Sequence, residues 1–395
     1  MAGILDGIRV LDFGRYIAGP YCATLLAELG AEVIRIEKVG GSEDRTYAPV
    51  EPGKTGALFL QMARNKRGLT LKPTTPAGRE IVRRLVARAD VVVANLPPPA
   101  LAQMGIDYAS LRAVKPDIIL ATTSAFGRGG PMSDRVGYDG IGQAMNGAMY
   151  LSGWPEAPMR AYLPYVDFGT ALYSAFGTLA ALMERARSGQ GQVVETSLLG
   201  TALSFNNAAL IEQAVIKPDR VGTGNRAQLS APTDAFQTAD GWLLVQVVGD
   251  QLFRRWAKLM GEDDPWLTDP RFADDRGRGD HRDQVCERMA AWCGERTTEQ
   301  CLAELEAARI PAGPVLSPQQ ALDHPHIRAM RLLLPLDFPG LGTPAPVARV
   351  PLELSATPGV IRHRAPRLGE HSDAILAELG YGEAEIAALR AEGTV

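Results

Sequence analysis

Residues 7–38, GIRVLDFGRYIAGPYCATLLAELGAEVIRIEK, decide the fold that the chain is expected to adopt. Residues 7–14 predict a buried strand, and residues 18–30 place apolar side chains at helical spacing with a glycine at the carboxyl end. Residues 31–38 predict a second strand. A strand, a helix and a strand in this order predict two parallel strands joined by a right-handed crossover, which is the beginning of an α/β domain.

The same alternation continues along the chain. Residues 67–73, 90–96 and 118–127 predict further strands, and residues 76–89 predict a helix opened by Pro76. The order indicates a doubly wound α/β domain, in which ligands bind beyond the carboxyl ends of the strands. The loops expected to matter are therefore residues 14–20, 38–45, 95–105 and 124–140.

The pattern changes from about residue 225. Residues 234–248 contain two strand-like runs around Asp240-Gly241, which is a hairpin signal. Helical stretches follow at 251–261 and 281–310. This part predicts a second, smaller α+β domain.

A Pro-rich stretch, residues 338–359, predicts a long connector, and the helical pair within residues 371–393 is expected to pack back onto the first domain. The expected layout is a large domain of residues 1–205 and 345–395, a small domain of residues 225–328, and linkers at 206–224 and 329–344.

Composition narrows the class of protein. The chain has 41 basic and 45 acidic residues, a formal net charge of -4, and no basic block, so no nucleic-acid partner is expected. The N-terminus lacks the pattern of a signal peptide, and the most apolar run is interrupted by Gly, Ser and Thr, so no membrane partner is expected. The cysteines have no metal-ligand spacing and are expected to be reduced thiols of a cytoplasmic protein: Cys22, Cys286, Cys293 and Cys301. The histidines are not grouped as metal ligands either, and no metal site is expected.

Several common enzyme motifs are missing. The loop after the first strand reads GRYIAG (residues 14–19), which is not the dinucleotide fingerprint G-x-G-x-x-G. Neither a P-loop nor a G-x-S-x-G nucleophile elbow occurs. Basic residues do recur near the predicted strand ends, and together they would suit a ligand with several phosphates: Arg15, Arg35, Lys38, Arg45, Lys66 and Arg67.

A single carboxylate, Asp167, precedes the long apolar run in YLPYVDFGTALYSAFGTLAALMER (residues 162–185). It could be a helix N-cap that accepts backbone N–H groups, with the helix dipole favouring its anion. The same arrangement would keep a nucleophilic carboxylate ionised near neutral pH. The local sequence leaves both interpretations open.

Four segments in the expected order, residues 7–47, 65–71, 189–203 and 365–381, together resemble the class III CoA-transferase family, the CaiB/BaiF group. The resemblance implies a large Rossmann-like domain built from both chain ends, a smaller inserted α+β domain and an interlinked homodimer. It also implies that Asp167, in YVDFGTAL, is the catalytic nucleophile.

The chemistry implied is CoA transfer from a donor acyl-CoA to a free carboxylic acid. Asp167 would attack the thioester to give a mixed anhydride, and CoA thiolate would then form an aspartyl-CoA thioester. Such an enzyme needs no tightly bound cofactor, because coenzyme A is a substrate. Residues 221–225, VGTGN, are the candidate oxyanion or gating loop, with Gly222, Gly224 and Asn225 as its key positions.

Contacts to CoA carry over from the same resemblance. The implied CoA-site residues are Tyr16, Ile17, Lys38, Lys66, Arg67, Asn95, Leu96, Met104 and Tyr138. The chain departs from its family at residues 95–105, where Pro97 and Gln103 replace arginines that relatives often carry. Phosphate binding is then expected either to depend more on Lys38, Lys66 or Arg67, or to be weaker.

Two alternatives are weighed against transfer. An α-methylacyl-CoA racemase of the same fold would need two bases, but Tyr138 stands where racemases have histidine, although Asp234 stands where they have glutamate. An acyl-CoA-binding protein without turnover would not require Asp167. The sequence therefore favours the transferase and does not identify its donor or acceptor.

Overall fold

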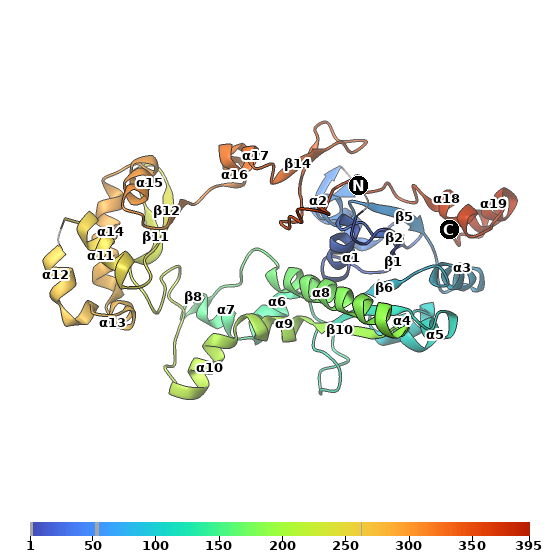
Figure 1. Cartoon of the computed structure of the whole chain (residues 1–395), viewed down its shortest axis with the longest axis horizontal. Helices are drawn as coiled ribbons and strands as arrows, with labels where there is room; N and C mark the ends of the chain where they lie inside the picture. Colours follow the sequence, from blue (N-terminus) through green and yellow to red (C-terminus); the bar gives the residue numbers. More distant parts are fainter. Residues whose placement is uncertain (1–2, 52–54, 262) are drawn as a thin grey trace. The chain divides into compact units, whose positions relative to one another are not determined.

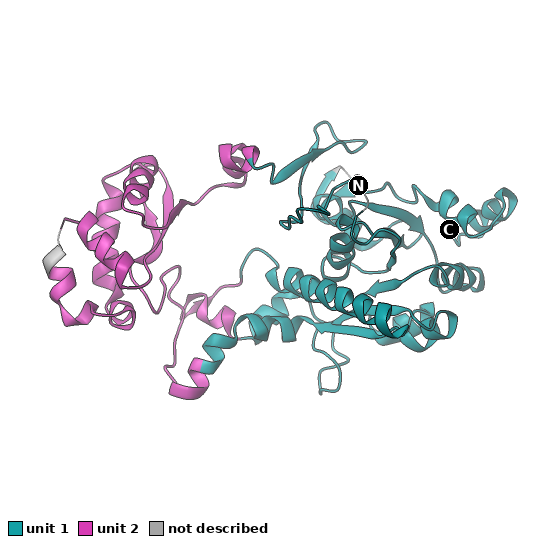
Figure 2. Cartoon of the chain, in the orientation of Figure 1, with its two compact units in different colours: residues 1–146, 161–211, 330–395 teal, residues 147–160, 212–329 magenta. Residues whose placement is uncertain are grey.

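The computed structural model describes residues 3–51, 55–261 and 263–395, and the chain forms two compact units (Figures 1 and 2). Unit 1 comprises Met1–Asn146, Ala161–Ile211 and Met330–Val395, and is thus built from both ends of the chain. Unit 2 comprises Gly147–Arg160 and Glu212–Ala329. The sequence predicts a similar division, but it places residues 147–160 in the larger part.

A six-stranded sheet forms the centre of unit 1, and all its neighbouring strands are parallel. Its order is β10 (Val193–Ser197), β7 (Ile119–Ser124), β6 (Val91–Ala94), β1 (Arg9–Asp12), β2 (Glu32–Glu37) and β5 (Lys66–Thr70). Numbered along the chain, the sheet strands run 3-2-1-4-5-6, which is the doubly wound order. The α/β prediction is therefore confirmed, and the strand order reverses between β1 and β6.

Helices cover both faces of this sheet, because its central strands are apolar on both sides. Along β1, Val10 packs on one face and Leu11 on the other. The face of Val10 is covered by α1 (Ala18–Glu28) and α8 (Tyr165–Ser188). The face of Leu11 is covered by α3 (Pro76–Val86), α4 (Pro98–Met104), α5 (Tyr108–Val114), α18 (Ser372–Glu378) and α19 (Glu383–Ala391). The C-terminal helical pair thus packs on the sheet, as the sequence predicts.

Smaller elements complete unit 1. The 3-10 turn η1 (Glu43–Thr46), β3 (Pro49–Glu51), β4 (Thr55–Gly56) and α2 (Ala57–Met62) lie between β2 and β5 in the chain. β14 (Leu333–Leu336) pairs with β15 (Ala345–Ala348), so the predicted connector contains a strand. Around the start of α8 lie α6 (Asp139–Met145) and α9 (Leu198–Phe205), and α10 (Asn207–Ile216) crosses the boundary between the units.

Helix α8 alone, among the described residues, has the length and composition of a membrane span. Half of its most apolar 18-residue window is buried inside the protein. It packs against α1 and the sheet, which is the position of a core helix.

Unit 2 contains the antiparallel sheet β11 (Thr233–Gln237), β12 (Trp242–Gln246) and β13 (Ala312–Pro314), so the predicted hairpin is present. Its core gathers Trp256, Met289 and Leu305 with three of the four cysteines, and all four are buried free thiols. The other elements of this unit are α7 (Ala148–Leu151), β8 (Gly153–Trp154), β9 (Ala157–Pro158), α11 (Asp250–Leu259), α12 (Asp263–Thr268), η2 (Pro270–Phe272), α13 (Asp275–Asp280), α14 (Arg282–Gly294), α15 (Thr298–Ala307), α16 (Pro318–Asp323) and α17 (Pro325–Ala329).

Candidate functional site

The loop after β1 and the end of β6 meet where the strand order reverses. Asn95 accepts the backbone N–H of Arg15 at 2.7 Å and donates its amide to the Arg15 carbonyl at 2.8 Å. Both halves of the Asn95 side chain are thus used to hold this loop. The structure therefore gives Asn95 a positioning role at the edge where a doubly wound sheet binds its ligand.

Tyr16 lies in that loop in a left-handed backbone conformation, with φ at 60°. Its N–H donates to Asp44 at 3.2 Å, and its ring meets the ring of Tyr138 edge-on, with 5.9 Å between centroids. A non-glycine residue in this conformation is strained, and such strain is concentrated at functional sites. The structure therefore brings together two predicted site residues, Tyr16 and Tyr138, from loops more than a hundred positions apart.

Asp167 lies in the first turn of α8 but is not its N-cap. The cap position is Pro164, and Asp167 is the third helical residue. Pro164 itself makes no side-chain capping bond. The N-cap interpretation of Asp167, one of the two that the local sequence leaves open, is therefore wrong, because the helix begins three residues earlier than a cap at Asp167 would require.

The capping is done instead by Asp139, at the start of α6. Its Oδ1 atom accepts the N–H of Val166 at 2.8 Å and the N–H of Asp167 at 3.0 Å. Its Oδ2 atom accepts from the Gln143 side-chain amide at 2.5 Å. Asp139 is 6% exposed, so these are buried, charge-assisted hydrogen bonds, the strong kind.

The electrostatics of Asp167 follow from this arrangement. Burial, and then the nearby Asp139 carboxylate, raise the pKa of Asp167 to about 7. The sequence argument expected the helix dipole to keep the carboxylate ionised near neutral pH. Desolvation and the like charge of Asp139 act in the opposite direction and favour its protonated form.

Lys66 is not available to a ligand. Its ammonium group is fully buried and donates to Asp12 at 2.8 Å and to the Pro20 carbonyl at 2.7 Å. Burial lowers its pKa to about 8. Arg35 joins the same buried network through Asp12 and Asp44. The prediction that Lys66 contacts CoA phosphates does not fit this position, because its charge already neutralises a buried carboxylate.

Arg67 is likewise engaged within the protein, in ion pairs with Glu32 at 2.7 Å and with Glu378 at 2.6 Å. Its guanidinium spans β5, β2 and α18 and is only partly exposed. A ligand phosphate would have to displace one of these carboxylates. Of the three basic residues on which phosphate binding was expected to depend, Lys38 alone has a largely exposed side chain, and it pairs with Glu43.

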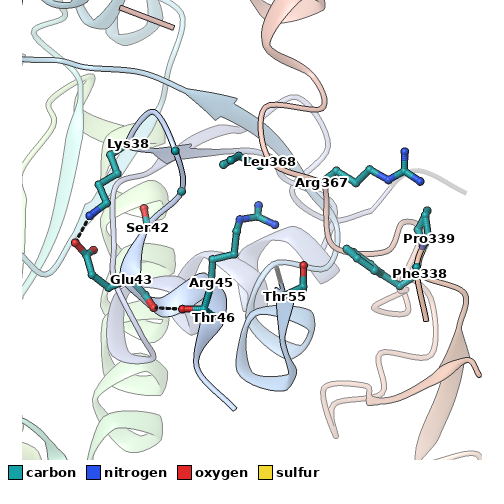
Figure 3. Close-up of a pocket in the computed structure, with 13 residues that line it drawn as sticks. Lys38, Ser42, Glu43, Arg45, Thr46, Thr55, Phe338, Pro339, Arg367 and Leu368 are labelled. Atoms are coloured by element: carbon teal, nitrogen blue, oxygen red, sulfur yellow. Dashed lines mark hydrogen bonds and ion pairs between the residues drawn. The ribbon is translucent and has the colours of Figure 1, made fainter. Parts of the chain in front are cut away.

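Lys38 lines a cavity of about 660 Å³ that is shown in Figure 3. Arg45 and Arg367 also line it, together with the apolar side chains of Phe338 and Leu368. Arg45 is fixed by a two-fold contact with Glu37, at 3.0 and 2.6 Å. The Ser42 hydroxyl on the wall is buried without a hydrogen-bond partner in the described part of the chain. The wall is therefore basic and has an unused polar group.

The remaining predicted residues of unit 1 are mostly part of the packing. Ile17, at the N-cap of α1, is buried, and Leu96 and Met104 pack against the core on the α4 side of the sheet. Within residues 3–51, 55–261 and 263–395, no group of His, Cys, Asp and Glu is arranged to hold a metal ion.

The predicted gating loop belongs to unit 2. Gly224 has φ at +64°, and its N–H donates to the Gly153 carbonyl at 2.5 Å. A Cβ atom at Gly224 would lie 2.8 Å from the ring of Trp154, and one at Gly222 would meet the Gly153 carbonyl. Asn225 follows in the same turn. Both glycines are therefore required by the close approach of this loop to β8.

Asp234, the residue in the position of a racemase glutamate, is paired with Arg226 at 2.9 Å in unit 2. Its carboxylate also accepts a backbone N–H, from Ala235. Both of its oxygens are thus engaged within unit 2.

Sequence reasoning missed Asp139 as a site residue. One signal could have found it: Pro164 has no N–H and no side-chain acceptor, so the apolar helix that follows needs a cap from elsewhere in the chain.

Comparison with known proteins shows which proteins the chain resembles. The model of CoA-transferase family III matches residues 5–372. A succinyl-CoA–D-citramalate CoA-transferase of Chloroflexus aurantiacus is 35% identical over 99% of this chain and 98% of its own. A succinate–glutarate CoA-transferase of Agrobacterium fabrum is 34% identical over 95% of each chain. The crystal structure of a CaiB/BaiF family protein from Brucella suis superposes with a TM-score of 0.84, at 32% identity, over 96% of this chain and all of the other.

Proposed function

The chain belongs to CoA-transferase family III and is an enzyme of that class, and on this premise we propose that it carries CoA between two carboxylic acids on Asp167. One observation carries the proposal. The Asp167 side chain is half-buried in the first turn of α8, and no hydrogen bond to its carboxylate occurs among the described residues, while its own N–H is held by Asp139. A desolvated carboxylate without donors is a reactive nucleophile.

The proposed reaction has four steps. Ionised Asp167 attacks the thioester carbonyl of the donor, the C–S bond breaks, and CoA thiolate leaves a mixed anhydride. The thiolate attacks the aspartyl carbonyl, which releases the donor acid and leaves an aspartyl-CoA thioester. The acceptor carboxylate then displaces the thiolate to form a second anhydride, and the thiolate attacks its acyl carbonyl. Acceptor acyl-CoA leaves, and Asp167 is free again.

No proton is consumed or released in these steps, because each nucleophile and each leaving group is an anion. A general base is therefore unnecessary. Water must be excluded, since it would hydrolyse the anhydride and lose the thioester energy. The gating loop at Gly222, Gly224 and Asn225 is proposed to provide this exclusion. The Gly224 N–H already donates to the Gly153 carbonyl, so the other N–H groups of the loop are the proposed donors to the developing oxyanion.

The relatives support a choice of substrates. Those described above are named for succinyl-CoA or succinate paired with citramalate or glutarate. We propose succinyl-CoA as the donor and a dicarboxylic acid of similar length as the acceptor. The racemase alternative is not favoured, because these relatives are CoA-transferases and Asp234 is held in an ion pair.

CoA itself is proposed to bind along the carboxyl edge of the sheet. The strained loop with Tyr16 and Ile17, the Tyr138 ring and the β6 end at Asn95 and Leu96 would face the pantetheine arm. Lys38, on the cavity wall with Arg367, is the proposed phosphate contact. Its largely exposed ammonium supports this role, whereas the buried ion pair of Lys66 does not.

A cytoplasmic, interlinked homodimer is the proposed assembly. Helix α8 supports the association of two chains, because Leu172, Phe176 and Met183 are all more than half exposed on its surface. An apolar side chain in water favours burial by a second chain. Light scattering should give the mass of a dimer, and a monomer at micromolar concentration would reject this assembly.

The test of function is direct. Purified enzyme with succinyl-CoA and D-citramalate or glutarate should form the corresponding acyl-CoA, detected by liquid chromatography and mass spectrometry. Asp167→Asn should abolish product while CoA still binds. If no acceptor supports transfer but deuterium from solvent enters a 2-methylacyl-CoA, the racemase reading replaces the transferase.

A further inference from the structure

We propose that Asp139 is a positioning residue for the transfer reaction, which caps helix α8 in place of local groups so that the Asp167 carboxylate stays free of donors. The inference rests on the proposed role of Asp167 as the nucleophile. It assigns a function to a residue that touches neither substrate in the proposed mechanism.

The first support is geometric. Asp139 holds the N–H groups of Val166 and Asp167 with one carboxylate oxygen, while Gln143 donates to the other. The side-chain carbonyl of Gln143 accepts the N–H of Ala161 at 2.9 Å. The pair therefore fixes the backbone on both sides of the entry into α8. This is more than a cap requires, and it determines where the Asp167 side chain begins.

The second support is the sequence at the helix start. In a capping box, a carboxylate at the third helical position accepts the N–H of the N-cap residue. Asp167 occupies that third position, but the N-cap is Pro164, which has no N–H. The local donor is thus missing. The Tyr165 N–H donates to the Leu163 carbonyl, and Asp139 accepts the N–H groups of Val166 and Asp167. Proline and Asp139 together leave the Asp167 carboxylate without the hydrogen bonds that would lower its reactivity.

Among the described elements packed against α8, Asp139 is the charged neighbour that acts on the Asp167 carboxylate. Helix α9 carries no charged side chain, and β7 carries none. Helix α1 presents Tyr21, whose ring packs on Phe168, and the carboxylate of Glu195 on β10 pairs with Arg128. The like charge of Asp139 also contributes to the raised pKa of Asp167, after burial.

The decisive variant is Asp139→Asn, which keeps an oxygen acceptor for the two N–H groups and removes the charge. We expect the fold and the KM for succinyl-CoA to be retained. The acid limb of the kcat/KM profile should move to lower pH, because Asp167 then ionises more easily. Asp280→Asn is the control, since it removes one charge from an exposed position on α13 in unit 2 and should leave the profile unchanged.

Two further variants separate positioning from charge. Asp139→Ala leaves two N–H groups without an acceptor, and a displacement of about 1 Å at the nucleophile should lower kcat about 100-fold with little change in KM. Pro164→Ala supplies an N–H that Asp167 can accept, so kcat should fall while the stability of the fold is kept. If Asp139→Ala does not fold, Asp139→Asn and Pro164→Ala decide the question.

A readout without turnover keeps this test apart from the proposed function. A carbodiimide with glycine ethyl ester labels protonated carboxyl groups, and peptide mass spectrometry gives the pH dependence at Asp167. In Asp139→Asn and in Pro164→Ala the midpoint should lie below that of the wild type. Equal midpoints in all three proteins would overturn the positioning role, even if transfer is observed. Absence of transfer in a wild type with the expected midpoint shift would reject the proposed function alone.

Discussion

The backbone nitrogen of Asp167 lies 3.0 Å from Oδ1 of Asp139, which is 28 positions earlier in the chain. A helix that carries a nucleophile is thus capped from another element, and the carboxylate that a reader of the sequence would assign to the cap remains available. The consequence is a carboxyl group whose pKa, raised chiefly by burial, is about 7. Both the activity and the stability of the protein should depend on this group.

The activity of the wild type should fall as the pH is lowered below about 7. The attacking form of Asp167 is the anion, so kcat/KM should decrease tenfold per pH unit below a pKa near 7 and level off above it. Initial rates between pH 5 and 9 at constant ionic strength check this. A profile flat down to pH 5 would show that Asp167 is ionised throughout, contrary to its environment.

Asp167→Asn should make the protein more stable at pH 8 while removing its activity. The folded pKa is raised above the ordinary 3.8, so between about pH 4 and 7 the folded state binds more protons than the unfolded state. Stability therefore falls as pH rises through that window, and the amide avoids the loss. Because the side chain is only half-buried, the gain should be on the order of 1 kcal/mol. Urea unfolding at pH 5 and 8 measures it, and a variant less stable at both would contradict the account.

Substitution of Lys66 should reduce the stability of the fold, whereas substitution of Lys38 should weaken the binding of CoA. Lys66→Met leaves the Asp12 carboxylate buried without its ammonium partner and should cost about 3–5 kcal/mol of folding free energy. Lys38→Ala removes an exposed ion pair with Glu43, worth about 0–1 kcal/mol, but should weaken CoA binding. Thermal unfolding and calorimetric titration with CoA separate the two. Normal stability in Lys66→Met with lost CoA affinity would restore the phosphate role that the structure denies it.

Gly224→Ala should damage the predicted gating loop. The new Cβ would approach the Trp154 ring to 2.8 Å in a backbone conformation that disfavours alanine, so we expect a loss of about 1–3 kcal/mol in the free energy of unfolding and a lower kcat. Gly294→Ala, in the same unit, meets no atom within 4 Å and is the control. If Gly224→Ala keeps full kcat, the loop has no part in catalysis.

Most of the fold could be predicted from the sequence, because its strands and helices are indicated by patterns within short stretches of the chain. The short, buried apolar runs of β1 and β6, Pro76 at the start of α3 and Asp240-Gly241 in the hairpin are short-range signals. The strand in the connector was missed, since β15 contains Pro346 and pairs with β14, which lies outside the connector.

The site was predicted less completely, for a physical reason. Whether a charged side chain is free to bind a ligand depends on its partner within the protein. The partner of Lys66 is Asp12, which lies 54 positions away in the chain. Likewise, the cap of α8 comes from Asp139, which no spacing rule connects to Asp167. The sequence indicates which residue types can do the chemistry, whereas the fold determines which of them are already engaged with other groups.

The most direct test of the central claim is mass spectrometry of the protein after incubation with succinyl-CoA and quenching with hydroxylamine. The account predicts a hydroxamate on the peptide that contains Asp167, absent in Asp167→Asn and formed only when acyl-CoA is present. A protein that transfers CoA yet yields the hydroxamate on another residue, or on none under conditions of turnover, would contradict it.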